Sequence, residues 1–245
     1  MTASGDTIDP AEVSRFAAQA AGWWDPGGSF RPLHRLNPAR LAFIRDALTA
    51  HFGRDPRSLT PFAGLSLCDI GCGGGLIAEP MARLGCQTTA IDADQAAIAV
   101  AREHADASGL SIDYRCETAE SLAEGETRFD VVLALELIEH VADPAALIAA
   151  CAALLKPGGA FIGATLNRTP QSYALAILGA EYVMGWLPRG THDWRRFLRP
   201  AEFVLGLRRA GLNPTRLQGL RYRLASGDWG PTDDLSVNYL VMAVR

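Results

Sequence analysis

The chain has 245 residues with a formal net charge of -4 and an apolar share of 49%, which excludes the compositions of disordered and collagen-like proteins. An extended nucleic-acid-binding surface needs a clustered excess of lysine and arginine, so we expect no nucleic-acid partner. The five cysteines lack CxxC spacing, and we expect buried, reduced thiols and not metal ligands.

The first part of the chain, residues 1–64, is expected to form helices and a lid over substrate and cofactor. Residues 9–22 open on a cap residue followed by proline and carry apolar residues at helical spacing, which predicts a helix. Prolines and glycines interrupt any period in residues 23–38, which predicts a loop whose aromatic side chains either cover the site or pack as a cluster. A second helix is expected over residues 37–53, because Asn-Pro opens it and glycine closes it.

From residue 65 onward, short β-type runs alternate with helical stretches such as 94–108 and 144–156. This alternation predicts βαβ units, and therefore a doubly wound α/β core with a mainly parallel sheet and helices on both faces. We place the cofactor-binding core at residues 65–166. The predicted strands are residues 65–70, 87–92, 111–116, 129–135 and 159–166.

After the core, the alternation stops. Residues 167–197 mix apolar, aromatic and basic side chains, and we interpret them as an insertion that serves as a membrane or substrate lid. Residues 198–245 return to the core with a helix over 200–210 and a closing strand. That strand is expected at an edge or as the hairpin partner of the strand near 214–222.

A glycine-rich turn follows the first predicted strand of the core. Gly71, Gly73 and Gly75 let the backbone turn tightly and let a ligand approach within van der Waals contact. Asp92 closes the next strand about twenty residues later, where a carboxylate can accept hydrogen bonds from both ribose hydroxyls. Since open parallel sheets bind ligands at the carboxyl ends of their strands, this region predicts a nucleoside-containing cofactor. Asp92 could instead cap the helix that begins near Asp94.

The class of cofactor depends on the acid that precedes the turn. Read from Gly73, the turn also fits the looser GxGxxA pattern of NAD(P)-binding oxidoreductases, which are the alternative. Asp69 would repel a pyrophosphate and attract an ammonium group, unless its carboxylate only caps the turn. The run Asp-Ile-Gly-x-Gly-x-Gly resembles the first motif of class I S-adenosylmethionine-dependent methyltransferases. That resemblance implies that Ala119 and Glu120 approach the adenine.

A candidate catalytic group follows the fourth predicted strand at its carboxyl end. If residues 136–140 form a helical turn, Glu136, Glu139 and His140 share one face. They could hold a divalent cation such as Mg²⁺, which binds a catechol oxygen and lowers its pKa. Alternatively, His140 acts as a base oriented by a glutamate, or these side chains only satisfy one another. His192 is a rival base.

Several longer segments resemble the UbiG-type O-methyltransferases of ubiquinone biosynthesis. These segments are FAAQAAGWWDPGGSFRPLHRLNPARLAFI, DIGCGGG, ELIEHVADP, LLKPGGAFIGATLNRTPQSY and GAEYVMGWLPRGTHDWRRF. Together they span residues 16–200, and the WWDP to RLNP block is far more specific than a glycine loop. The C-terminal part departs from the family pattern, because Arg223-Leu224 stands where Asn-Pro is often seen.

The resemblance implies a Rossmann-like class I methyltransferase fold with seven strands, and S-adenosylmethionine-dependent methylation of ring hydroxyls on polyprenylated phenols and catechols. It also implies cofactor contacts from Arg40, Gly71, Asp92 and Leu135, and a guanidinium at position 40 can clamp a carboxylate with two hydrogen bonds. In mitochondrial relatives the ExxEH residues are associated with a divalent metal, which favours the metal alternative. Other ubiquinone-biosynthesis proteins are candidate partners, and a non-catalytic scaffold of such an assembly is the remaining alternative.

A polyprenyl substrate also gives a reason for the aromatic and basic side chains of the insertion, which suit the interface of a membrane. The start of the sequence has no basic and apolar signal pattern. We therefore expect a cytoplasmic enzyme that is peripheral to the inner face of the cell membrane. The alternative is a lid that packs only on its own core.

Overall fold

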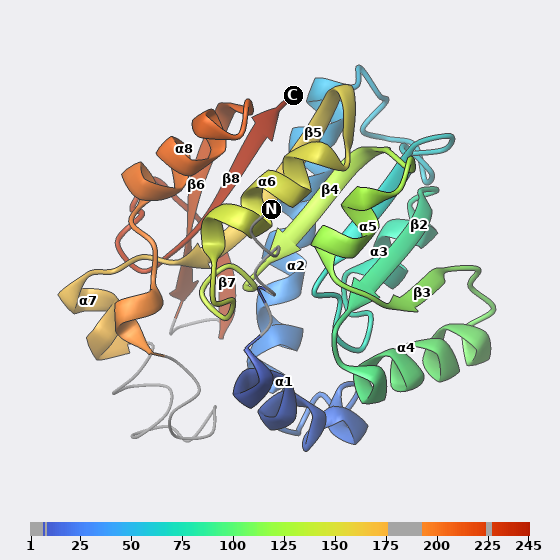
Figure 1. Cartoon of the computed structure of the whole chain (residues 1–245), viewed down its shortest axis with the longest axis horizontal. Helices are drawn as coiled ribbons and strands as arrows, with labels where there is room; N and C mark the ends of the chain where they lie inside the picture. The colour runs from blue at the N-terminus through green and yellow to red at the C-terminus, as the bar shows by residue number, and fades with distance from the viewer. Residues whose placement is uncertain (1–6, 8, 176–192, 224–226) are drawn as a thin grey trace, which may run out of the picture.

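The computed structural model describes residues 7, 9–175, 193–223 and 227–245, which are organised around one mixed β-sheet (Figure 1). The strands are β1 Ser66–Ile70, β2 Gln87–Asp92, β3 Asp113–Cys116, β4 Phe129–Leu135, β5 Leu155–Leu166, β6 Asn213–Arg223, β7 Asp228–Thr232 and β8 Asn238–Val244. Over these described ranges the sheet has eight strands in the order β3-β2-β1-β4-β5-β8-β6-β7. β1 to β5 are parallel, and β8, β6 and β7 join antiparallel.

Helices cover both faces of this sheet, as the alternation predicted (Figure 1). They are α1 Pro10–Ala17, η1 Ala20–Gly22, α2 Arg31–His51, α3 Ala78–Arg83, α4 Gln95–Ala107, α5 Ala119–Glu124, α6 Pro144–Ala153, α7 Pro170–Ser172, η3 Trp194–Arg196 and α8 Pro200–Arg209. α5, α6 and α8 share one apolar cluster, which contains Leu122, Leu147 and Phe203. α2 and α3 share another, which contains Ile44 and Met81. The doubly wound α/β core is confirmed.

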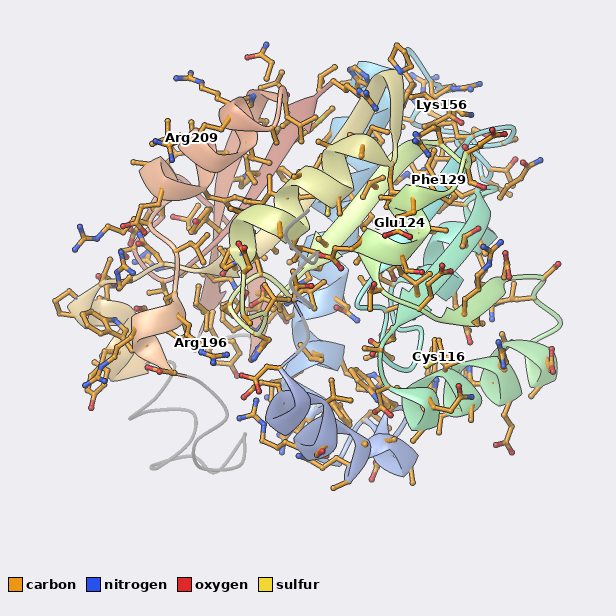
Figure 2. The ribbon with its side chains drawn as sticks, in the orientation of Figure 1. Cys116, Glu124, Phe129, Lys156, Arg196 and Arg209 are labelled. Atoms are coloured by element: carbon orange, nitrogen blue, oxygen red, sulfur yellow. The ribbon has the colours of Figure 1, made fainter. Side chains whose placement is uncertain are left out.

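The strand order reverses direction between β1 and β4, which makes this point the topological switch of the sheet. In open α/β sheets, ligands bind outside the carboxyl ends of the strands at such a switch point. Figure 2 shows Phe129 and Lys156, near the amino ends of β4 and β5, at the end of the sheet far from α1. The carboxyl ends of the central strands therefore face α1.

The C-terminal part of the sheet differs in detail from the prediction. β8 pairs with β6 as expected, but it lies inside the sheet between β5 and β6 and not at an edge. The edge strand is β7, which contains Gly230 and Pro231 and was not predicted. Proline is tolerated in an edge strand, because no inner ladder depends on the N–H that it lacks. The seven expected strands are therefore eight.

The N-terminal region is more helical than its prolines indicate. Residues 9–22 form two short helices, α1 and η1, in place of one. The loop predicted over residues 23–38 is wrong in its second half, because α2 begins at Arg31 and continues through Pro38. An interior proline costs about 3 kcal/mol, which the burial of one helix face offsets. The apolar side chains buried on that face are Leu36, Phe43, Ile44, Ala47 and Leu48.

The insertion expected at residues 167–197 is described only at its two ends, since residues 176–192 lie outside the described residues. The ends are joined, because Trp194 donates its indole N–H to the Thr169 carbonyl at 2.9 Å. In the described ranges, no helix is both long and apolar enough to cross a membrane. The division of the chain at residues 64, 166 and 197 stays a prediction.

Two tryptophans fasten the N-terminal region to the glycine-rich turn. Trp24 donates its indole N–H to the Gly74 carbonyl at 2.9 Å. Trp23 packs over Gly73 and Gly74 and stacks on Phe30 with ring centroids 3.8 Å apart. Since a Cβ on Gly73 would overlap the Trp23 ring, the turn needs glycine for packing as well as for its φ of 52°. The aromatic residues form a packed cluster on the turn.

Gly73→Ala is expected to destabilise the protein more than Gly109→Ala. Both glycines have left-handed φ values, 52° and 64°, so each substitution introduces backbone strain of about 1–2 kcal/mol. Only at position 73 does the new Cβ overlap a neighbour, Trp23, whereas nothing lies within 4 Å of a Cβ at position 109. Overpacking of this kind adds about 1–3 kcal/mol. Urea unfolding of both variants measures the difference, and equal losses would show that Trp23 moves aside freely.

Candidate active site

A cavity of about 780 Å³ lies at the carboxyl ends of the central strands. It reaches from the glycine-rich turn and β2 to β6 and β7, and α1 and α2 line it from the N-terminal region. Its volume is in the range of small-molecule sites. The predicted site residues that line it are Arg40, Asp69, Gly71, Gly73, Asp92, Ala119, Glu120, Leu135, Glu136 and His140. Gly75 and Glu139 lie outside the lining.

Asp92 holds the glycine-rich turn in place. Its two carboxylate oxygens accept hydrogen bonds from the backbone N–H groups of Gly73, at 2.8 Å, and Asp94, at 2.9 Å. The helix cap that Asp92 could have supplied is Asp94 instead, which is the N-cap of α4. Burial raises the pKa of Asp92, and the two backbone hydrogen bonds oppose that rise. The carboxylate is thus fixed at the edge of the cavity.

Asp69 is a buried acid with one unsatisfied oxygen. It is 3% exposed and accepts a hydrogen bond from the Ala78 N–H, while its Oδ2 has no partner in the described structure. Burial and the charge of Asp92 raise the pKa of Asp69 to about 7, although Arg40 lowers it. A buried carboxylate next to a second one favours a cationic ligand group, because a nearby positive charge stabilises the ionised form.

Arg40 brings a cation to the same cavity. Arg40 is 3% exposed as a residue, and its guanidinium lies 2.8 Å from Glu136 Oε1 and donates to Asn37 Oδ1 at 3.2 Å. Its Nε has no hydrogen-bond partner in the described residues. A buried guanidinium with an unused donor can take a carboxylate from a ligand. The cavity therefore offers an anionic group, Asp69, and a cationic group, Arg40, to one zwitterionic end of a ligand.

Thr7, Ala119, Glu120 and Leu135 line another side of the cavity. Glu120, in the first turn of α5, accepts a hydrogen bond from Thr7 Oγ1 at 2.9 Å. Ala119 beside it is buried, and Leu135 ends β4 on the lining. This arrangement forms an apolar wall with a carboxylate at its rim.

Residues 136–140 follow β4 as a series of turns and not as a helix, so the expected common face of a helical turn is wrong. Glu136 has a φ of 51°, a left-handed value that costs energy in a residue with a Cβ. This backbone conformation directs the Glu136 carboxylate toward Arg40. The same carboxylate accepts a hydrogen bond from Asn238 Nδ2 at 3.1 Å. The left-handed backbone of Glu136 thus places its carboxylate beside Arg40, a position that a residue with helical backbone angles would not give it.

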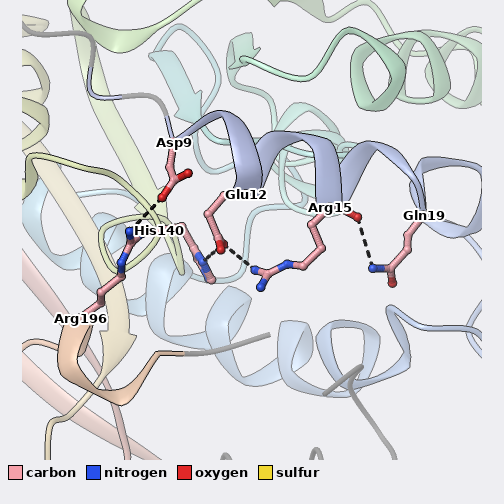
Figure 3. A network of polar contacts seen from close by, with 6 residues as sticks. All are labelled: Asp9, Glu12, Arg15, Gln19, His140 and Arg196. Carbon is pink, nitrogen blue, oxygen red and sulfur yellow. Dashed lines mark hydrogen bonds and ion pairs between the residues drawn. The ribbon is translucent and has the colours of Figure 1, made fainter. Parts of the chain in front are cut away.

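Glu139 and His140 take different partners from Glu136. Thr165 Oγ1 donates to Glu139 Oε2 at 2.9 Å, and burial, with the charge of Glu136, raises the pKa of Glu139 well above its usual range. The Nδ1 of His140 lies 2.7 Å from Glu12 Oε2 (Figure 3). Over the described part of the chain, no three His, Cys, Asp or Glu residues are grouped as metal ligands. As placed, the three side chains do not fit a metal ion, and the divalent cation stays a prediction.

Two residues of the site were missed by the sequence reasoning. Glu12 lies 128 residues from His140, and no spacing rule connects the two positions. Asn238 is 3% exposed within an apolar closing strand, and a lone buried amide in such a run is a signal that could have been read. The rival base, His192, lies outside the described residues.

Comparisons with known proteins identify the family. A family model described as a methyltransferase domain matches residues 68–163. The protein named ubiquinone biosynthesis O-methyltransferase of Cereibacter sphaeroides (strain ATCC 17029 / ATH 2.4.9) is 55% identical over 243 residues, which cover 99% of this chain and 98% of that protein. The chain belongs to the ubiquinone biosynthesis O-methyltransferases. The protein of the same name from Parvibaculum lavamentivorans is 52% identical and is covered to 96%.

Solved structures agree on the fold. Magnesium protoporphyrin IX methyltransferase from Synechocystis PCC 6803, determined with bound S-adenosylmethionine, is 16% identical over the full length of both chains with a TM-score of 0.59. A possible histamine N-methyltransferase from Thermotoga maritima is 15% identical, with 96% of this chain and 98% of that chain covered and the same TM-score. The class I methyltransferase fold is confirmed, and with the family it excludes the NAD(P) oxidoreductase alternative.

Binding of S-adenosylhomocysteine is expected to weaken as the pH falls below 7. The pKa of Asp69 is about 7, and an ammonium group beside it favours the ionised carboxylate, so binding below pH 7 must release a proton. The dissociation constant therefore rises by up to about tenfold for each pH unit below 7.

Calorimetric titration between pH 5.5 and 7.5 measures this pH dependence. Asp69→Asn, which cannot titrate, is expected to bind more weakly at neutral pH with a nearly flat profile. A wild-type affinity that is constant across this range would exclude Asp69 as the partner of the ammonium group.

Proposed function

We propose that this chain methylates ring hydroxyls on polyprenylated phenols and catechols of ubiquinone biosynthesis, with S-adenosylmethionine as the methyl donor. The observation that carries this proposal is one cavity that joins the proposed cofactor cradle, defined as Arg40, Asp69, Asp92, Ala119 and Glu120, to apolar side chains from α2 and the far strands. His140 lies between them, in the turns that follow β4. The proposal is supported by relatives of that name that are similar over nearly the whole chain.

The cofactor cradle fits the parts of S-adenosylmethionine in turn. Arg40 would hold the carboxylate, Asp69 the ammonium group and Asp92 the ribose hydroxyls. Ala119 and Glu120 would border the adenine. When bound, the cofactor supplies an electrophilic methyl group on a sulfonium. The protein must then orient the acceptor oxygen in line with that methyl group and remove its proton.

The apolar end of the cavity suits the prenyl tail. Its lining includes Leu33, Leu36, Leu166, Leu220 and Trp229, which come from α2 and from strands on the far half of the sheet. Each methylene that moves from water into such a site contributes about 0.8 kcal/mol of favourable transfer free energy to binding. A polyprenyl group would gain its binding free energy here from these apolar side chains, and the ring would lie beside the end of β4.

His140 is the proposed base for the ring hydroxyl. A phenol has a pKa of about 10, so at neutral pH a base must take its proton as the new bond forms. His140 lines the cavity, and its Nδ1 lies 2.7 Å from the Glu12 carboxylate oxygen Oε2. A divalent cation held by Glu136, Glu139 and His140 is the alternative, and the side chains as placed do not form that site.

His140→Ala is expected to lower the kcat for a short-chain catechol by about 10²- to 10⁴-fold, the usual contribution of a general base. The affinity for S-adenosylhomocysteine should stay within about twofold, because position 140 carries no part of the cofactor cradle. Methyl transfer is measured by mass spectrometry of the product, and cofactor affinity by calorimetry. No turnover of any phenol or catechol by the wild-type chain would favour the scaffold alternative.

Exhaustive chelation separates the base from the metal in the same assay. Activity that survives chelation while His140→Ala abolishes it supports the base. Activity that is lost on chelation and returns with magnesium or zinc would support the metal at Glu136, Glu139 and His140.

Peripheral contact with the inner face of a membrane completes the proposal. A polyprenyl substrate is dissolved in the bilayer, and the sequence of residues 172–197 carries aromatic residues and arginines that suit a lipid interface. Most of this segment lies outside the described residues. Contacts with other ubiquinone-biosynthesis proteins stay a prediction.

The chain is expected to float with liposomes that contain anionic lipid, and to float less as salt rises, because screening weakens the attraction. Trp186→Glu, which introduces a charge among the apolar residues of the segment, should reduce flotation while turnover of a soluble catechol is kept. Equal behaviour of both proteins with and without liposomes would show that the segment is only a lid.

A further inference from the structure

Trp23 brings a buried hydrogen-bond donor to the cavity. The residue is 8% exposed and lines the cavity. Its indole Nε1–H has no hydrogen-bond partner in the described structure, although a buried indole N–H ordinarily finds one. A buried donor that stays unpaired loses its hydration without compensation. The position of this N–H therefore indicates a ligand atom that would accept it.

The indole of Trp23 is held in place before any ligand binds. Its ring stacks on Phe30, with ring centroids 3.8 Å apart and 11° between the planes. The Trp23 carbonyl accepts a hydrogen bond from His34 Nε2 at 2.8 Å, and the Trp23 backbone N–H donates to the Ala20 carbonyl at 3.2 Å. Because these contacts fix the backbone and the plane of the ring, a ligand need not order this side chain when it binds.

The glycine-rich turn places the indole N–H next to the proposed ribose site. The indole carbon Cε2, which is bonded to Nε1, lies 3.1 Å from the position that a Cβ on Gly73 would take. The backbone N–H of Gly73 donates to Asp92 Oδ2 at 2.8 Å. Both Asp92 oxygens accept backbone hydrogen bonds, and neither accepts one from Trp23. The indole donor and the Asp92 acceptor therefore flank the same glycine.

A ribose hydroxyl has a use for both of these groups. Each hydroxyl donates one proton and accepts through two lone pairs. An ionised carboxylate such as Asp92 can only accept, so a hydroxyl bound to it still needs a donor for its own oxygen. Trp23 Nε1 is such a donor, and no group of the described structure competes for it.

We propose that Trp23 is a cofactor-binding residue: its Nε1–H donates to the oxygen of a ribose hydroxyl whose own proton goes to Asp92. This inference rests on the proposed function, because it takes S-adenosylmethionine as the methyl donor and Asp92 as the partner of its ribose. Trp23 lies between η1 and α2, so the hydrogen bond would join the N-terminal region directly to the cofactor.

Trp24 offers a matched control, because it packs on the same turn with its donor already used. Its Nε1 donates to the Gly74 carbonyl at 2.9 Å, and its ring stacks on His104 with centroids 3.5 Å apart. Among the described residues that line the cavity, Trp23 is present and Trp24 is not. Phenylalanine at either position removes an indole N–H and shortens the ring equally, but only at position 23 is the lost N–H available to a ligand.

Trp23→Phe is expected to weaken binding of S-adenosylhomocysteine about 3- to 10-fold, the usual effect of losing one uncharged hydrogen bond. Trp24→Phe should change this affinity by less than about twofold. 5′-Methylthioadenosine, which has the ribose and the adenine but not the amino-acid part, should bind Trp23→Phe more weakly by the same factor. Calorimetric titration measures the affinity for both ligands, and urea unfolding checks that both variants fold.

The indole proton of Trp23 gives a second readout in the unaltered protein. Its ¹H–¹⁵N resonance should move downfield when S-adenosylhomocysteine is added, because a hydrogen bond deshields the proton. The indole resonance of Trp24 should keep its position, since that proton is bonded with and without the ligand. This measurement decides the proposal even if Trp23→Phe does not fold.

The outcomes separate this contact from the cofactor assignment. If S-adenosylhomocysteine binds wild type and Trp23→Phe equally well and the Trp23 resonance does not move, the contact is wrong and the cofactor stands. If Trp23→Phe binds only S-adenosylhomocysteine more weakly, and not 5′-methylthioadenosine, the N–H serves the amino-acid end and the ribose contact is wrong. If both tryptophan variants weaken binding equally, the two residues only hold the turn and the proposal is wrong. If the wild type does not bind S-adenosylhomocysteine, the proposed function itself fails.

Discussion

The hydrogen bond from the Gly73 N–H to the Asp92 carboxylate joins the end of β2 to the turn after β1. Parallel pairing of the strands already brings these two ends close together. The hydrogen bond then fixes the position of the turn at the edge of the cavity. Trp23 then packs on the outer side of the turn, which holds the N-terminal region over the cavity. Backbone hydrogen bonds from Gly71 and Cys72 to the Ile91 carbonyl join the same two strand ends, so the turn is held at several points.

Four ionisable groups beside the cavity depend on one another, three of them buried and one, Glu136, partly buried. Asp69, Arg40, Glu136 and Glu139 would each be costly to bury alone, because a charge removed from water loses several kcal/mol of solvation. Arg40 offsets part of that cost by pairing with Glu136 and by lowering the pKa of Asp69. Burial, with the charge of Glu136, raises the pKa of Glu139, which no cation of the described residues offsets by an ion pair, so this carboxyl group stays protonated to a higher pH. In this site, ion pairing therefore offsets only part of the solvation cost of burying the charges.

The sequence predicted what depends on local pattern. The strands at 87–92 and 129–135 are confirmed, since an apolar run between turn residues leaves few alternatives. The glycine-rich turn and Asp92 were found because strand, turn and acid follow one another along the chain. α2 was misjudged because proline is a strong local signal, and the tertiary burial of a whole helix face outweighs it. The contact of Glu12 with His140 could not be predicted from the sequence. It joins two residues that lie far apart in the chain, and no rule of residue spacing connects them.

The place of α1 in the chain affects the order in which the molecule is built. It is among the first elements to be synthesised, but its polar partners lie 128 and 187 residues later. A helix of eight residues is not stable alone in water, so α1 must wait for the core before it can become ordered. The contacts that form last in folding are those with the least local support, and they also open at the lowest cost in the native state. Local unfolding of α1 would therefore uncover one wall of the cavity while the sheet beneath stays intact.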